Sequence, residues 1–166
     1  MASVTQTYGT YTILTATGFV LNNSTGTGFL SKYVENTGVA ALDYEIFLSL
    51  SAINTAPAND KAVYVYALPW IVSGGTTWFG PDAGTTTLPT TGETSFLTIS
   101  SPNNMKLLGV ANYTTQNQPV RANFFLSNAF GSSMPDAWSL FLMNYGGPTF
   151  NSANSVGYRA ISMNVI

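Results

Sequence analysis

Apolar and polar residues alternate over two long stretches of the chain, and this alternation predicts β-strands. Between Ala41 and Ile53, one face carries the apolar residues Leu42, Tyr44, Ile46, Leu48 and Leu50. The opposite face of that stretch carries Asp43, Glu45, Phe47, Ser49 and Ser51. Between Ala62 and Val72, the residues Val63, Val65 and Ala67 oppose Tyr64, Tyr66 and Leu68. Pro69 has no N–H to donate, so we expect it at a sheet edge or at the end of this strand.

A second pattern spans residues 120–145, where two aromatic-rich apolar runs stand close together. The runs are Val120–Phe130 and Ala137–Tyr145, and Gly131, Pro135 and Asp136 between them predict a hairpin. The second run is apolar on both of its faces, which predicts a strand that lies deep in a sheet.

Shorter β-type runs complete the pattern. They are Tyr11–Val20, Thr27–Val34, Glu93–Ser100, Met105–Tyr113 and Val156–Val165. The sequence therefore predicts an all-β protein, an antiparallel β-sandwich of about eight to ten strands with little or no helix. A jelly roll is the most economical version with eight strands. We expect one domain over residues 13–166, preceded by an N-terminal arm at residues 1–12 that is polar and rich in threonine.

The composition adds an unusual shortage of charge. Charged residues make up 7% of the 166 residues, against about 25% in ordinary soluble domains, while 45% are hydrophobic. A surface with so few charges must rely on neutral polar residues or be covered by partners, and we favour assembly with partners.

Several classes of partner and chemistry lack the residues they need. The five cationic residues are scattered and the net charge is −2, so we expect no nucleic-acid partner. No apolar run is long enough to predict a membrane span, and the N-terminus lacks the pattern of a targeting segment. The chain has no histidine and no cysteine, which excludes Ser-His-Asp and Cys-His hydrolysis and an ordinary zinc site. We expect no cofactor and no enzymatic activity.

Carboxylates offer the remaining catalytic or metal-binding possibilities. Asp43 and Glu45 share one strand face, where they could form an acid–base pair, although a polar strand face is the simpler interpretation. Asp82 could ligate calcium, but the spacing of a known calcium loop is absent, so we interpret it as a turn residue. The glycine pairs near residues 26 and 74 lack the context of a phosphate-binding loop.

An aromatic loop, residues 70–84, offers a possible ligand site. Trp70, Trp78 and Phe79 stand near Asp82 and several threonines, a set that could stack against sugars and bind their hydroxyl groups. The simpler interpretation, which we favour, is that these aromatics fix the loop to the sandwich or lie in a subunit contact.

Two pairs of segments in the chain have distinctive motifs. The first pair is VYVYALP at residues 63–69 and WFGPDAG at residues 78–84. The second pair is MPDAWSLFLMNYGG at residues 134–147 and SANSVGYR at residues 152–159. These segments resemble small β-sandwich virion proteins of tailed phages, and the second pair is similar to the closing strands of that group. Together with their surroundings, these segments cover about half of the chain.

This resemblance implies a capsid decoration, or cement, protein. Such a jelly roll sits on the outer surface of the capsid, commonly as a homotrimer, and bridges neighbouring copies of the major capsid protein. The N-terminal arm could lie across joints of the coat as an added strand. We expect the arm and one end of the sandwich to bind the shell, with Tyr8, Tyr11, Trp70, Trp78 and Phe79 as interface aromatics.

Two other functions remain open on the sequence. The chain could be a glycan-binding or receptor-binding domain of a phage fibre, using the aromatic loop. It could also be another structural virion subunit that assembles with the shell or tail.

Overall fold

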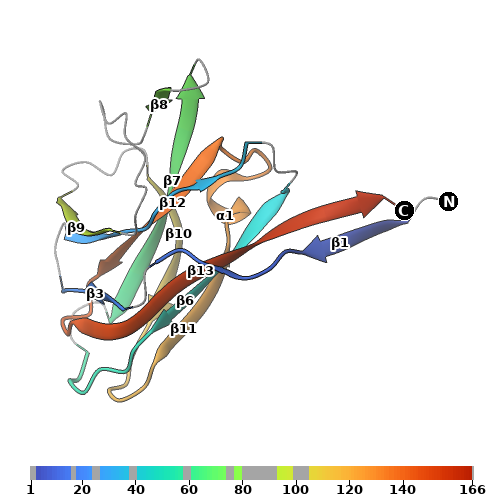
Figure 1. The fold of residues 1–166 in the computed structure, drawn as a ribbon. Coiled ribbons are helices and arrows are strands. Elements are labelled where there is room, and N and C mark those ends of the chain that lie inside the picture. Colours follow the sequence, from blue (N-terminus) through green and yellow to red (C-terminus); the bar gives the residue numbers. More distant parts are fainter. Residues whose placement is uncertain are drawn as a thin grey trace.

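The computed structural model describes residues 3–15, 18–23, 27–37, 41–57, 61–73, 77–79, 93–98 and 105–165. In this part of the chain, β-strands form two antiparallel sheets that face each other (Figure 1). The first sheet has the order β1 (Val4–Tyr8), β13 (Phe150–Val165), β6 (Asp43–Leu50) and β11 (Val120–Phe125), and β2 (Thr12–Ile13) and β3 (Phe19–Leu21) also pair with β13.

The second sheet has the order β10 (Lys106–Asn112), β7 (Ala62–Ser73), β12 (Ala137–Asn144), β4 (Thr27–Leu30) and β9 (Glu93–Thr98). The short strand β5 (Val34–Glu35) pairs with β12, and β8 (Thr77–Phe79) pairs with β7. The expected antiparallel β-sandwich is therefore confirmed.

The core lies between the two sheets and is built from the inward positions that the alternation predicted. Tyr44, Ile46, Leu48 and Leu50 of β6 are buried in it together with Val63, Val65 and Ala67 of β7. At its centre the indole of Trp138 packs on the rings of Tyr44 and Tyr158, with centroids 5.1 and 5.4 Å away. Leu42, which the pattern grouped with the inward face, lies just before β6 and is exposed.

Strand β12 is the central strand of the second sheet. It pairs with β7 along its whole length and with β4 and β5 on its other side, and all eight of its residues are buried. The prediction of a deep strand with two apolar faces is confirmed. Its neighbour β7 contains Pro69, which pairs with Trp138 beyond the point where the β10 ladder ends at Ala67. At Pro69, β12 is the neighbour of β7 on one side, and no described strand pairs with Pro69 on the other. This position agrees with the prediction that the proline lies at a sheet edge.

The hairpin predicted for residues 120–145 is wrong. Strand β11 pairs with β6 in the first sheet, whereas β12 pairs with β7 in the second. The connection crosses between the sheets through the short helix α1 (Ser127–Phe130), which ends at Gly131 with a φ of 69°, a value that glycine adopts without strain. Turn residues between two apolar runs mark a reversal of the chain, but they do not say whether the second run returns to the same sheet.

The strand pairings are nested along the chain. The N-terminal strands β1, β2 and β3 pair with the last strand, β13. Inside that pair, β4 pairs with β12, β6 with β11, and β7 with β10. Each pair encloses the next in sequence, so both sheets contain strands from the two halves of the chain.

Two buried asparagines hold the ends of these strands. The amide of Asn154 donates to the carbonyl groups of Phe19, Phe150 and Asn151, and its Oδ1 accepts from the backbone N–H of Ser51 at 2.8 Å. Asn144 accepts from the Tyr113 hydroxyl at 2.8 Å and donates to the carbonyl of Pro148 at 2.7 Å. Both asparagines fall in the segments that carry the resemblance, and their contacts are structural.

Candidate interaction surface

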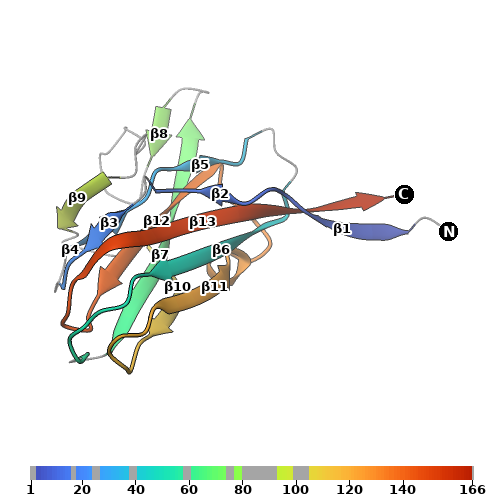
Figure 2. The same cartoon turned by 60° about the horizontal axis from the view of Figure 1, so that its bottom comes forward.

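The N-terminal arm pairs with the C-terminal strand and forms a ribbon that extends beyond the sandwich. Its ladder runs from Val4 opposite Val165 to Tyr8 opposite Ile161, whereas β6 follows β13 only as far as Ile161. Figures 1 and 2 show the two chain ends side by side at the tip of this ribbon. We call Val4–Tyr8 together with residues 161–165 the terminal ribbon.

The terminal ribbon is uncharged, and its N-terminal strand is exposed throughout. Val4, Tyr8 and Met163 are 62%, 48% and 57% exposed, and no residue of the ribbon carries a charge. Proteins usually protect a projecting edge strand with charged residues or proline, because its free N–H and C=O groups can pair with another chain. An uncharged edge of this kind is suited to adding a partner strand.

The orientation of the free edge follows from the hydrogen bonds. The N–H of Gly9 donates to the carbonyl of Ala160 at 2.8 Å. In an antiparallel ladder, N–H groups alternate in direction, so those of Thr5 and Thr7 face β13 as well. The N–H groups of Val4, Gln6 and Tyr8 then face the free edge of β1, where the described part of the chain supplies no partner strand.

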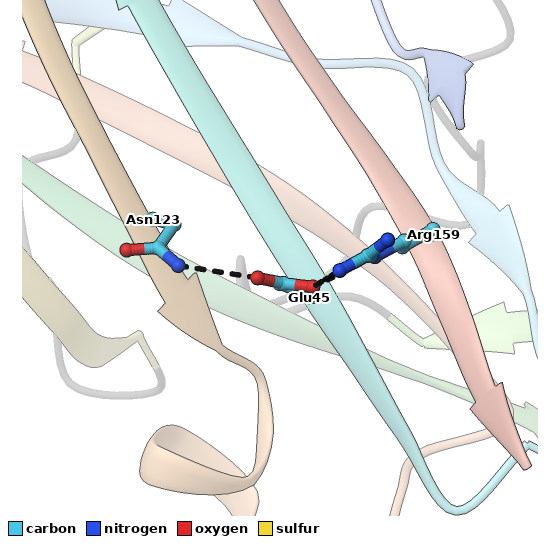
Figure 3. Close-up of polar contacts among 3 residues, drawn as sticks. All are labelled: Glu45, Asn123 and Arg159. Carbon is cyan, nitrogen blue, oxygen red and sulfur yellow. Dashed lines mark hydrogen bonds and ion pairs between the residues drawn. The ribbon is translucent and has the colours of Figure 1, made fainter. Parts of the chain in front are cut away.

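An ion pair anchors the base of the ribbon to the sandwich. Arg159 of β13 donates from Nε and Nη2 to Oε2 of Glu45 on β6, at 2.7 and 2.6 Å. The amide of Asn123 on β11 donates to the other oxygen of that carboxylate at 3.1 Å. Figure 3 shows Glu45 held between the two side chains across three neighbouring strands.

Aromatic rings surround this ion pair on the outer face of the first sheet. The guanidinium of Arg159 lies 4.3 Å from the centre of the Tyr8 ring and 5.5 Å from that of Phe47. The Tyr11 ring meets Phe47 edge-on at 5.5 Å, and partial burial raises the pKa of Tyr11. A Cβ atom at Gly157 would collide with the Tyr11 ring, so this glycine makes room for it. Of the predicted interface residues, Tyr8 and Tyr11 therefore come together.

The carboxylates considered as an acid–base pair both have structural partners. Asp43 accepts from the backbone N–H and the hydroxyl of Ser127 at 2.9 and 2.6 Å, which fixes the start of α1 to β6. Glu45 is occupied by Arg159 and Asn123. The interpretation of this strand face as structural thus agrees with the geometry. No group of three or more acidic residues that could hold a metal ion occurs in the described ranges.

A second surface lies on the outer face of the other sheet. Tyr64 and Tyr145 meet edge-on at 5.1 Å above the buried residues Leu68, Phe141 and Met143. Burial, with Tyr145 and Tyr64 nearby, raises the pKa of Tyr66. We call this surface the tyrosine face, and its members are Tyr64, Tyr66, Leu107, Val110 and Tyr145.

The structure removes Trp70 from the set of surface aromatics. Trp70 is 3% exposed, and its indole N–H donates to the hydroxyl of Ser139 at 2.9 Å inside the second sheet. Trp70 packs with Ala137 and Tyr33, so its surface is used within the chain. Trp78 and Phe79 belong to β8, which pairs with residues 71–73, while Asp82 lies outside the described residues. The indole of Trp70 is therefore not open to a sugar.

Phe47, Asn123 and Arg159 belong to the outer face of the first sheet but were not predicted as interface residues from the sequence. Phe47 had a usable signal, because it is the aromatic residue on an otherwise polar strand face. Arg159 is a single cation in a strand of neutral residues, which is also visible in the sequence. Their meeting with Tyr8 depends on the register of β1, β6 and β13, which a single sequence does not specify.

No family model matches the chain, and no curated protein is significantly similar to it. No helix in the described part is long and apolar enough to cross a membrane.

Proposed function

We propose that the chain is a capsid decoration protein of a tailed phage, attached to the outer surface of the shell through the terminal ribbon. The observation that carries the proposal is the ribbon itself, a projecting two-stranded edge without charge. An isolated pair of strands is only marginally stable in water, so an exposed ribbon gains most by docking against a partner. The partner we propose is the major capsid protein.

The nested pairings support a jelly roll. With β5, β8 and β9 set aside and β1, β2 and β3 counted as one broken strand, eight strands pair first with last and inward from there. One sheet then has the order first, eighth, third and sixth, and the other has fifth, fourth, seventh and second. This order supports a double-sheet jelly roll, an architecture found in viral capsid domains and also in lectins and cupins.

The mechanism of attachment is strand addition. An extended segment of the coat would pair with the free edge of β1, using the outward N–H groups of Val4, Gln6 and Tyr8. Main-chain hydrogen bonds would supply affinity, and the aromatic rings at the base of the ribbon would pack against the joint.

Self-association multiplies this contact. The tyrosine face carries exposed Leu107 and Val110 beside three tyrosines, a surface suited to contact between copies of the chain. A homotrimer would present three ribbons at once, so weak individual contacts would give stable decoration.

Light scattering tests the self-association. The purified protein should have a mass of about three chains, and Val110→Lys should lower that mass. A monomer in both samples would refute self-association through this face.

The experiment for shell binding uses a matched pair of substitutions at Gln6. Gln6→Pro removes an N–H that faces the free edge and leaves the β13 ladder intact, whereas Gln6→Ala keeps the N–H. Purified protein is mixed with undecorated capsids of the same genome and pelleted. Strand addition predicts that Gln6→Pro loses binding while Gln6→Ala keeps it. Equal binding of both variants would refute attachment through this edge.

A further inference from the structure

A pocket opens on the outer face of the first sheet. It has a volume of about 310 Å³ and lies over the cross-strand pairs of β6 and β11. Phe47 and Asn123 are opposite each other at one end, and Ser49 and Arg121 are opposite each other at the other. Leu48 and Ala122 form the floor with their backbones, because their side chains point into the core. The pocket therefore combines an aromatic wall with polar side chains.

Two hydrogen bonds hold the guanidinium of Arg121 in an orientation that leaves one of its edges, Nε and Nη2, open. Its Nη1 donates to the carbonyl groups of Leu50 and Val120, both at 3.1 Å. Its Nε and Nη2, the pair that Arg159 uses to bind Glu45, have no partner among the described residues. This edge of a guanidinium matches a carboxylate with two parallel hydrogen bonds.

Glu45 does not compete for this edge. Its carboxylate already accepts from Arg159 and Asn123, and Arg121 forms no ion pair within the described residues. Asn123 donates to Glu45, and Figure 3 shows its carbonyl oxygen directed away from that carboxylate. Within the described part of the chain, the pocket thus presents an unpaired cation, an amide oxygen without a hydrogen bond and the ring of Phe47.

A second pocket also includes Arg121 in its lining. Its volume is about 250 Å³, and its lining is rich in amide and hydroxyl side chains: Asn112, Thr114, Thr115 and Gln118. One arginine therefore separates an aromatic pocket from a pocket of neutral hydrogen-bonding groups. This combination suits sugars, since their rings have apolar faces and their edges carry hydroxyl groups.

We propose that these two pockets form a binding site for a saccharide that carries a carboxylate. The carboxylate binds Nε and Nη2 of Arg121, a sugar ring stacks on Phe47, and hydroxyl groups of the adjoining sugar bind Thr114 and Gln118. This site is separate from the aromatic loop, and it shares Phe47 with the aromatic rings at the base of the terminal ribbon. It gives the chain a glycan-binding activity in addition to the proposed attachment to a shell.

The test is an NMR titration of the free protein, which requires no capsid and does not depend on the proposed decoration function. The acidic probes are sialyllactose and digalacturonate, and lactose is the neutral counterpart. At least one acidic probe should shift the backbone amides of residues 47, 49, 121 and 123, with lactose binding about tenfold more weakly or not at all. Absence of binding by both acidic probes, or equal binding of lactose, would overturn the proposal.

Substitutions at Arg121 test the role of its two parallel donors, Nε and Nη2. Arg121→Gln removes the charge, and Arg121→Lys keeps the charge but removes the two parallel donors, so both should weaken the acidic sugar about tenfold or more. Lys106→Gln is the control, since it removes an exposed charge from β10 outside both pockets. A folded Arg121→Lys protein that binds as tightly as the original would overturn the role of the two parallel donors. A Lys106→Gln protein that loses binding would show only a general charge effect and would overturn the site.

Discussion

Arg159 binds Glu45 through both nitrogens of one edge of its guanidinium, at 2.7 and 2.6 Å, although the two residues are 114 positions apart in the sequence. The pair joins β13 to β6 at the base of the terminal ribbon, and the same guanidinium lies 4.3 Å from the centre of the Tyr8 ring on β1. One side chain therefore links the strand that carries the free edge to the body of the sandwich.

Replacing Arg159 should loosen the ribbon and destabilise the fold. Arg159→Met leaves the nearly buried carboxylate of Glu45 with Asn123 as its remaining partner, and we expect a loss of about 1–3 kcal/mol in the free energy of unfolding. Urea denaturation measures this loss, and Lys106→Met is the control for removing an exposed charge. Hydrogen exchange of the Gly9 amide should also accelerate in Arg159→Met. Unchanged exchange at Gly9 would show that Arg159 does not hold β1.

Two glycines should respond differently to the same small substitution. A Cβ at Gly28 would collide with the backbone carbonyl of Leu142 and with the Phe141 ring, whereas a Cβ at Gly157 would meet the end of the exposed Tyr11 side chain. Backbone cannot move aside cheaply, but an exposed tyrosine can. We therefore expect Gly28→Ala to cost about 2 kcal/mol or more and Gly157→Ala to cost about 1 kcal/mol or less, measured by thermal unfolding. Equal losses would contradict this account of the two sites.

Removing the side chain of Asn154 should be among the most damaging single changes. It donates to three carbonyl groups and accepts from the N–H and hydroxyl of Ser51. Asn154→Ala leaves these buried groups without a partner, which we expect to cost about 2–4 kcal/mol in chemical denaturation. The exposed Asn123→Ala serves as the control and should cost less. A smaller loss for Asn154→Ala than for Asn123→Ala would contradict the structural role of Asn154.

Alkaline pH should destabilise the protein through its buried tyrosines. Burial raises the pKa of Tyr113 from 10.0 to about 12. Because the folded-state pKa lies above the unfolded value, the contribution of this group is complete below about pH 10 and is lost as the pH rises toward about 12. Urea denaturation across this range should show falling stability, with a shallower fall in Tyr113→Phe than in the original chain. An equally steep fall in Tyr113→Phe would contradict the assignment to Tyr113.

The sequence predicted individual strands better than their partners. Alternation in residues 43–50 placed Tyr44, Ile46 and Leu48 in the core correctly, because a strand with one buried face must show this period. The same pattern placed Phe47 on the outer face but could not show that Asn123 and Gly157 flank it there. Those neighbours come from strands far away in the sequence, and their register is set by the turns and by the whole core.

The failed expectations have a common physical origin. Trp70 was expected in an interface because tryptophan and tyrosine are enriched in subunit contacts, yet it is 3% exposed and its indole N–H donates to Ser139 within the chain. Residues 120–130 and 137–145 were expected to pair with each other, yet β11 pairs with β6 in the first sheet and β12 pairs with β7 in the second. Local patterns describe how much of a residue is covered, but they do not identify the strand that covers it.

The measurement that tests the central claim most directly is the co-sedimentation of the purified protein with undecorated capsids assembled from the major capsid protein of the same genome. Attachment through the terminal ribbon predicts that the protein pellets with the shells at a fixed ratio, and that removing residues 1–12 abolishes pelleting while the sandwich stays folded. A protein that remains in the supernatant at every shell concentration, or a truncated form that binds as tightly as the full chain, would contradict it.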